Sequence, residues 1–432
     1  MMLMKAGFAT QNITPRAGVL MDGFGKKTPA LYVHDDLFLR VLYICQGDTV
    51  QAIVSYDLLF MERFRVDRIK GAIGNATGLC PSEILVNFTH THAGPAVSNW
   101  AYAGQPEGVY LDLIEARTVE AVLAAREKCV DVSIDAGLTY TDLPINRRQP
   151  DEAGIAQWQV NPDGPVIKDL PFCIFREVQS RRVVGLLFSV ACHPSMMFET
   201  AISAEFPGAA VRQLNEHYET EGAIFLQGAA GDAKPRPAAN GDYWGRSTWE
   251  QMEEVGADLT RLVVEAEKSA VRLSPSLHAA LVDVPWRLLP PPSREELEGV
   301  LASESETPPR QAWARDMLAI QEWSGELPRE AGVLLHVIHL SEDLRIVAVE
   351  GEVLALLGRR ILDLMPPGLT FMLGYSNGTS LYLPDPADLP FGGYEVDSFW
   401  EYHKASSSAP DCHEPLVEAV SSVLRRGAAV NT

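Results

Sequence analysis

The sequence predicts an α/β fold in which a layered mixed β-sheet core is flanked by helices. Apolar runs of strand length alternate with amphipathic helical stretches over the whole of residues 1–432. No internal repeat or low-complexity linker separates one part of the chain from another. We therefore expect a single domain over 1–432, with a peripheral helical insertion at 287–330, where prolines and a serine open a heavily charged segment.

The first half should begin with extended chain and turns over 11–25. Apolar runs bounded by polar or turn residues then predict strands over 38–45, 50–57, 84–89, 172–177 and 182–192. Helical spacing of apolar residues predicts helices over 60–72, 109–128 and 207–219. Residues 145–170 are polar and rich in Pro, Gly and Asn, which predicts a long ordered loop over one face.

The second half continues the alternation of strands and helices. Short apolar runs predict strands over 222–227, 333–340, 344–350 and 369–375. Amphipathic spacing predicts helices over 247–270, 353–364 and 413–426. The segment 383–412 lacks either pattern and is expected to be loop.

Composition limits the kinds of partner. The 47% apolar and 22% charged content is ordinary for a globular protein with a large core. A formal net charge of −21 argues against nucleic acid or an anionic membrane surface as the main partner. No apolar stretch is long enough for a membrane span, and the N-terminal segment lacks a signal-type pattern. We expect a cytoplasmic protein that acts on a small molecule, and the oligomeric state stays open.

The cysteines indicate neither a disulfide framework nor a thiolate zinc site. All six are scattered and none forms a C-x-x-C pair; they stand at 45, 80, 129, 173, 192 and 412. A metal ion in this protein would therefore be held by nitrogen and oxygen atoms.

The strand predicted at 84–89 runs into His90-Thr91-His92, followed by Gly94-Pro95. Side chains at i and i+2 of extended chain point to the same side, so both imidazoles can face one site. In α/β folds such strand ends carry the chemistry. For this short pattern alone, two surface or packed histidines explain the residues equally well.

Three further apolar runs end in residues that can bind a metal. The run 183–192 stops at His193-Pro194, the run 344–349 stops before Glu352, and the run 369–375 is followed by Tyr382. Two histidines with a carboxylate and an open fourth position suit a catalytic zinc ion. Taken singly, His193 could be a core histidine, Glu352 a helix-start residue and Tyr382 ordinary packing. Together at strand ends, they favour a metal site at one rim of the sheet.

A glycine-rich turn follows the strand predicted at 222–227. The run Gln227-Gly228-Ala229-Ala230-Gly231-Asp232 permits a tight turn and close approach of backbone to a ligand. It does not match a phosphate-binding loop, because the spacing to Lys234 is wrong and no Ser or Thr follows. It is either a structural turn or a wall of the same pocket, with Asp232 orienting a ligand.

Seven segments, in this order, resemble motifs of the neutral/alkaline, non-lysosomal ceramidase family. They are the opening at 12–15 with 23–25, T-H-T-H-S-G-P at 89–95, N-R-S at 146–148, H-P-x-x-M at 193–197, Q-x-x-x-G-D-x-S-P at 227–235, P-G-E-x-T at 350–354, and N-x-Y-x-x-Y at 377–382 before the Tyr-Glu pair at 394–395. Each is short, and their joint order is specific. The resemblance implies a catalytic domain that hydrolyses the amide of an N-acylsphingosine with a zinc-activated water.

The resemblance also implies roles for particular residues. The implied Zn²⁺ ligands are His90, His193, Glu352 and Tyr382. The implied substrate-polarising and oxyanion-contacting residues are His92, Arg147 and Tyr394. The pocket wall or its immediate support is expected to contain Gln227, Asp232 and Lys234.

Some positions depart from the family pattern. Lys234 stands where the family has a serine, Ala93 where it has another serine, and Thr379 where it has a tyrosine. We expect the chain to lack the family's C-terminal immunoglobulin-like domain. These departures favour a smaller or more soluble substrate over a long-chain lipid in a membrane, so the expected substrate is a ceramide-like or smaller soluble amide. The alternatives are an ester, a lactone or a sugar derivative as substrate, or a binding protein without turnover.

Overall fold

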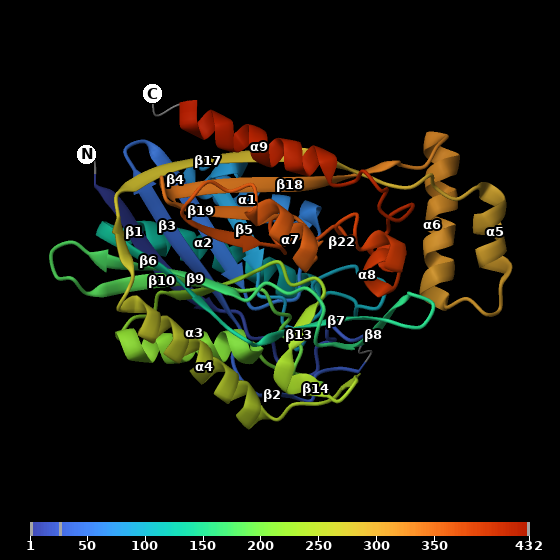
Figure 1. The fold of residues 1–432 in the computed structure, drawn as a ribbon, viewed down its shortest axis with the longest axis horizontal. Coiled ribbons are helices and arrows are strands. Elements are labelled where there is room, and N and C mark those ends of the chain that lie inside the picture. Colours follow the sequence, from blue (N-terminus) through green and yellow to red (C-terminus); the bar gives the residue numbers. More distant parts are fainter. Residues whose placement is uncertain (1–2, 26–27, 430–432) are drawn as a thin grey trace.

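Two β-sheets carry the fold of this computed structural model, which describes residues 3–25 and 28–429 (Figure 1). Among these residues the larger sheet has nine strands, in the order β12 (Ala223–Gln227), β10 (Val183–Val190), β9 (Asp169–Glu177), β6 (Val130–Tyr140), β1 (Met4–Asn12), β3 (Phe38–Gln46), β4 (Thr49–Tyr56) and β5 (Ile84–Phe88), with β16 (Val271–Leu273) paired to β6. The smaller sheet has the order β17 (Pro275–Arg287), β18 (Glu330–Ser341), β19 (Leu344–Val349) and β21 (Leu369–Leu373).

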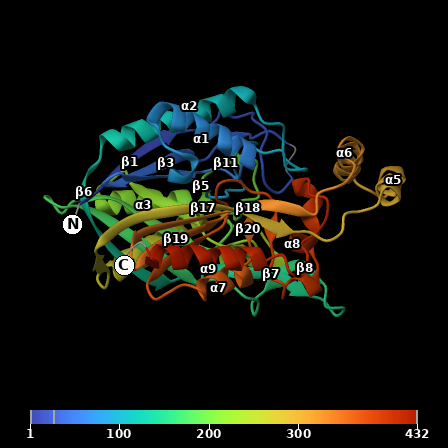
Figure 2. The ribbon, with the colours of Figure 1, turned by 90° about the horizontal axis from the view of Figure 1, so that it is seen from above.

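Helices cover the outer faces of both sheets. In Figure 2, α1 (Arg63–Thr77) and α2 (Gly108–Glu127) lie on one side of the strands, and α7 (Ala355–Leu362) and α9 (Glu414–Ala429) on the other. A further pair, α3 (Glu205–Tyr218) and α4 (Trp249–Glu267), packs on the β9–β10–β12 part of the larger sheet. Buried side chains from both sheets, such as Phe175 and Phe371, form the core between them. The layered mixed α/β fold predicted from the sequence is confirmed.

The two sheets meet where several strands end. A β-bridge joins Asn87 at the end of β5 to Ser376 beyond β21, and another joins Gly228 beyond β12 to Leu373 of β21. Pairing of β10 with β12 and of β19 with β21 is parallel, so their carboxyl ends lie at the same edge. Segments far apart in sequence are thereby brought to one rim.

Most predicted elements agree with the structure, and the long loop predicted at 145–170 is wrong. That segment contains the hairpin of β7 (Pro144–Pro150) and β8 (Ala156–Asn161) and the start of β9. Its polarity misled the prediction, because Arg147 and Arg148 are buried strand residues paired with Glu395. The strands β1, β6 and β17 were not predicted.

Within 287–330 the chain forms α5 (Arg294–Ala302) and α6 (Pro308–Ser324), which extend to one side of the sheets (Figures 1 and 2). The segment predicted as loop at 383–412 holds the short helix α8 (Tyr394–Asp397) and single turns of 3-10 helix. In the described part of the chain, no helix combines the length and the apolar character that crossing a membrane requires.

Candidate metal centre

His90 lies just beyond β5, in a backbone conformation that aims its ring at the rim where the strands end. Its φ is 67°, in the left-handed region that few non-glycine residues adopt. Its backbone N–H donates to Leu58 O at 2.9 Å, and its Nδ1 lies 2.9 Å from Leu59 O. Because Nδ1 is engaged by the backbone, Nε2 is the ring nitrogen left for a ligand.

His193 is fixed in the same way beyond β10. Its Nδ1 lies 2.6 Å from Ala230 O and 3.1 Å from Ala233 O, and its backbone N–H donates to Ala233 O. The glycine-rich turn after β12 thus holds this imidazole by its main-chain carbonyls. Nε2 is again the atom that faces the centre.

Glu352 completes a group of three donors. It lies in β20 (Glu352–Val353), and its Oε2 is 3.4 Å from His90 Nε2 and 3.4 Å from His193 Nε2. Among the described residues Oε2 accepts no hydrogen bond, whereas Oε1 accepts one from Tyr402 OH at 2.5 Å. Ligands of a tetrahedral zinc ion with bonds of about 2.0–2.2 Å lie about 3.3–3.6 Å apart, so these spacings fit one ion.

Two residues are candidates for a fourth donor to a metal ion. His92 Nε2 lies 3.2 Å from His90 Nε2, and candidate ligand atoms of His90, His92 and His193 all fall within 4.8 Å of one another. Tyr382 lies in β22 (Tyr382–Leu383) as the register partner of Glu352 in a parallel pair. The structure therefore brings every predicted ligand together and also places His92 among them. The division of roles between His92 and Tyr382 stays a prediction.

The protonation of the three imidazoles suits metal binding. Burial lowers the pKa of His90, and it lowers the pKa of His92 and His193 well below the ordinary value for histidine. Positive charge on neighbouring groups, including Arg147, acts in the same direction. The neutral imidazole is the form that binds a metal ion.

Arg147 connects the predicted catalytic groups to the donors. From β7 its Nε donates to Glu395 Oε1 at 2.7 Å, and its Nη2 donates to Tyr382 OH at 2.9 Å. Its Nη1 is 3.3 Å from His193 Nε2. The guanidinium is buried, so its orientation is fixed by these contacts.

Tyr394, the third predicted catalytic residue, contacts a carboxylate that the sequence analysis did not identify. Its hydroxyl donates to Glu401 Oε2 at 3.0 Å, and Trp100 Nε1 donates to the same oxygen at 2.9 Å. Burial raises the pKa of Glu401 to about 7, against the lowering effect of these two donors. Glu401 can therefore hold a proton near neutral pH.

Asp232 and Gln227 lie behind this site and do not line its cavity. Asp232 accepts hydrogen bonds from Asn146 Nδ2 and from Ala355 N–H, both at 2.9 Å, and its backbone carbonyl accepts from Arg147 N–H at 2.8 Å. The Gln227 N–H donates to Asn87 Oδ1, and its Nε2 donates to Cys192 O. Both residues tie together the strands that carry the ligands.

Lys234 lies in β13 (Ala233–Pro235) and lines the cavity. Its ammonium is 3.4 Å from Ser195 O and faces the rings of Phe24, Trp158 and Trp244, whose centroids are 5.1, 4.9 and 5.3 Å away. Burial and the charge of Arg147 lower the pKa of Lys234 to about 7, and they outweigh the opposing field of Glu205.

These residues surround a cavity of about 400 Å³, which we call the histidine cavity. Its walls are rich in aromatic side chains, and several wall residues had no assigned role at the sequence level: Phe60, Trp100, Tyr102, Trp158, Ser195, Glu401 and Tyr402. The volume lies within the range of small-molecule sites. An isolated aromatic residue in the sequence gives no signal that separates a pocket wall from ordinary core.

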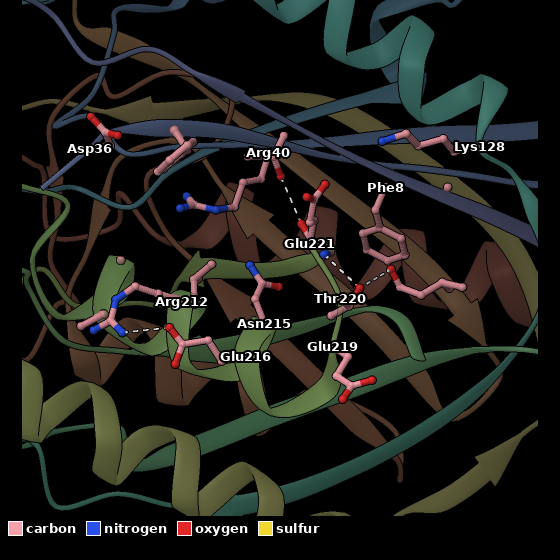
Figure 3. A pocket seen from close by; sticks show the side chains of 18 of the residues that line it. Phe8, Asp36, Arg40, Lys128, Arg212, Asn215, Glu216, Glu219, Thr220 and Glu221 are labelled. Carbon is pink, nitrogen blue, oxygen red and sulfur yellow. Dashed lines mark hydrogen bonds and ion pairs between the residues drawn. The ribbon is translucent and has the colours of Figure 1, made fainter. Parts of the chain in front are cut away.

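A cavity larger than the histidine cavity lies elsewhere in the described structure. This larger groove, of about 1160 Å³, is lined by residues that include Arg40, Arg212, Glu216 and Glu221 (Figure 3). None of the four predicted metal ligands lines it. Its volume therefore does not identify it as the chemical site.

The fold and the site define a class: a mixed-sheet α/β protein with a buried His-His-carboxylate group at the ends of its strands. The same fold occurs in neutral ceramidase from Pseudomonas aeruginosa, with a TM-score of 0.74, 15% sequence identity, and coverage of 99% of this chain and 75% of that one. A structure described as a ceramidase complexed with C2 gives a TM-score of 0.76 and 15% identity over 99% of this chain and 76% of that one. The predicted resemblance is confirmed at the level of the fold.

No protein-family model and no curated protein sequence matches the chain. At 15% identity the structural likeness establishes the fold and leaves the activity to be argued from the residues.

Proposed function

We propose that the protein is a zinc-dependent amidohydrolase that cleaves a linear N-acyl bond in a ceramide-like or smaller substrate. One observation carries this proposal. Glu352 Oε2 is buried, accepts no hydrogen bond from the described residues, and lies 3.4 Å from the Nε2 atoms of both His90 and His193. A buried carboxylate oxygen between two neutral imidazoles is costly unless a cation is bound there.

The donor set fits zinc. Imidazole nitrogen and carboxylate oxygen are ordinary zinc ligands, and each of the three residues is oriented by a second hydrogen bond to Leu59, Ala230 or Tyr402. When bound in such a site, zinc lowers the pKa of a coordinated water to about 7 and polarises a carbonyl oxygen.

The other residues of the histidine cavity supply donors for a substrate. Hydrolysis of an amide develops negative charge on the carbonyl oxygen, and a well-placed donor stabilises it by about 3–4 kcal/mol. Arg147, Tyr394 and His92 all line the cavity beside Glu352 and are the proposed donors. Glu401 also lines it, and its raised pKa suits transfer of a proton to the departing amine.

Metal analysis and a matched substrate screen test this proposal. Protein purified without a polyhistidine tag should contain about one zinc ion per chain, and a chelator should abolish activity that added zinc restores. The screen compares N-acyl amides of several chain lengths with the corresponding esters and with acylated sugar derivatives. Faster hydrolysis of amides supports the proposal, and preference for esters or sugars would move the activity to another bond. Protein that binds no metal would contradict it.

A further inference from the structure

Lys234 carries a buried amino group with donors to spare. Its side chain is 2% exposed, and an ammonium carries three N–H donors. Among the described residues the ammonium makes one hydrogen bond, to Ser195 O at 3.4 Å, and no carboxylate lies within ion-pair distance. A buried cation without a counter-charge is costly unless a partner arrives with the ligand.

Aromatic rings form the walls around this ammonium. Phe24, Trp158 and Trp244 face it from three separate segments of the chain, with ring centroids about 5 Å from Nζ. Such rings attract a cation through their faces, but they carry no net charge. They hold the ammonium in position and leave its need for an anion unmet.

A second unsatisfied group lies beside it. Ser195 lines the histidine cavity, is 3% exposed, and offers its backbone carbonyl to Lys234. Its own hydroxyl has no hydrogen-bond partner in the described part of the chain. A buried hydroxyl is normally satisfied, so a cavity wall with an unpartnered hydroxyl next to an ammonium has the donors of an anion site.

This pair of donors lies in the same cavity as the candidate metal centre. Lys234 follows Ala233, whose carbonyl holds both the ring and the backbone N–H of His193. The charge of Lys234 also acts on His92 and His193. His90, His92 and Lys234 therefore border the same space, which one extended ligand can fill.

We propose that Lys234 and Ser195 form a carboxylate subsite, so that the preferred substrate is a linear N-acyl compound carrying one carboxylate near the amide, as an N-acyl amino acid does. The part of this inference that says which bond is cleaved rests on the proposed amidohydrolase function. The part that says the substrate carries a carboxylate rests on the two donors. One ammonium balances one carboxylate, and the hydroxyl serves its second oxygen. The carboxylate of the ligand thereby supplies a counter-charge at ion-pair distance, which the described residues do not, although Glu205 acts on Lys234 through its field.

Binding of two matched probes tests the subsite without turnover. The probes are 4-oxoheptanoic acid, in which a methylene replaces the amide N–H of N-butanoylglycine, and its neutral primary amide. Calorimetry on the metal-loaded protein should show that wild type binds the acid at least about tenfold more tightly than the amide. Lys234→Met should reduce that ratio to about one to two, Lys234→Arg should retain part of it, and Ser195→Ala should lower it less than Lys234→Met does.

Metal content and melting temperature are measured for every variant, so that a misfolded or metal-free protein is recognised. Lys234→Arg keeps the proposal testable if Lys234→Met does not fold, because moving the charge should lower the ratio below that of wild type. A wild-type ratio near one, or an equal ratio in wild type and in a folded Lys234 variant, would overturn the subsite. Failure of both probes to bind would overturn it as well.

Kinetics separate this inference from the proposed function. Release of butanoate from N-butanoylglycine and from N-butanoylglycinamide gives two values of kcat/KM. Lys234→Met should lower the value for the acid by at least about tenfold more than the value for the amide, mainly through KM. If neither compound is hydrolysed but the acid probe binds through Lys234, the subsite stands and the proposed function fails. If both are hydrolysed with the same dependence on Lys234, the function stands and the subsite fails.

Discussion

The histidine cavity and the larger groove differ in how their charged groups are satisfied. In the groove, Arg212 donates to Glu216 at 3.1 Å and also pairs with Glu253, and all three side chains are about half exposed. In the histidine cavity, buried polar atoms converge, and Glu352 Oε2 and Ser195 Oγ have no partner among the described residues. The groove is almost three times larger, yet none of the described residues that line it carries a buried side-chain N or O atom without a partner.

This difference shows that volume is a poor guide to chemistry in this fold. Exposed ion pairs are already satisfied by each other and by water, so they gain little from a bound ligand. Buried polar atoms without partners raise the free energy of the folded state, and a ligand that supplies the missing hydrogen bond or charge removes that cost. The comparison therefore predicts large functional effects in the histidine cavity and small effects in the groove.

Removal of a metal ligand should have the largest effect. His193→Ala should reduce zinc from about one per chain to less than about a tenth, and lower kcat/KM by roughly 10²–10⁴-fold, which corresponds to several kcal/mol of lost charge stabilisation. His217→Ala, at an exposed histidine of α3, is the matched control and should keep its metal. Elemental analysis with steady-state kinetics checks both. Retention of zinc in the His193 variant would remove it from the ligand set.

Arg147 and Arg148 offer a matched pair on one strand. Both donate to Glu395, but Arg147 alone also contacts Tyr382 and His193. Arg147→Met should lower kcat by about 10²–10³-fold if the guanidinium stabilises the developing charge. Both variants should lower the free energy of unfolding by a similar amount, about 3–5 kcal/mol, because each leaves Glu395 with one buried partner fewer. Arg148→Met should cause a smaller loss of kcat than Arg147→Met. Denaturant unfolding and kinetics on folded protein separate the two effects, and equal losses of kcat would assign Arg147 a structural role only.

The pH dependence of activity should depend on Glu401. Its protonated form is the proposed proton donor, and burial raises its pKa to about 7, so kcat/KM should fall as the pH rises through about 7. Glu401→Gln should remove that limb of the profile and lower the rate at neutral pH by about 10–10²-fold. A profile from pH 5 to 9 checks both points. An unchanged limb in the variant would assign it to another group.

The convergence of residues at the candidate metal centre could be predicted in large part because they follow short apolar runs. His90, His193 and Glu352 each come after a strand whose length and composition are evident in the sequence. Strands of one sheet bring such ends to a common rim, so three short patterns could be combined. The expectation that nitrogen and oxygen donors would form the site followed from the scattered cysteines.

Other contacts left no signal along the chain. Tyr402 donates to Glu352 across 50 residues, and the register that pairs Glu352 with Tyr382 depends on tertiary packing. The long strand β17 was missed because prolines at both 275 and 285 interrupt its pattern. In β7, burial of arginines beside Glu395 contradicts the usual association of polar segments with exposed loops.

The smallest effect should come from a substitution in the larger groove. This prediction tests whether the groove and the histidine cavity really differ in function. Arg212→Ala removes two ion pairs whose side chains are 44–66% exposed, so the free energy of unfolding should fall by about 0–1 kcal/mol. Zinc content and kcat/KM should stay within about twofold of wild type, because no described contact links Arg212 to the predicted ligands. Denaturant titration and kinetics measure both quantities. A tenfold fall in kcat/KM with normal stability would mean that the groove takes part in function, and that paired, half-exposed charges can mark a site in this fold.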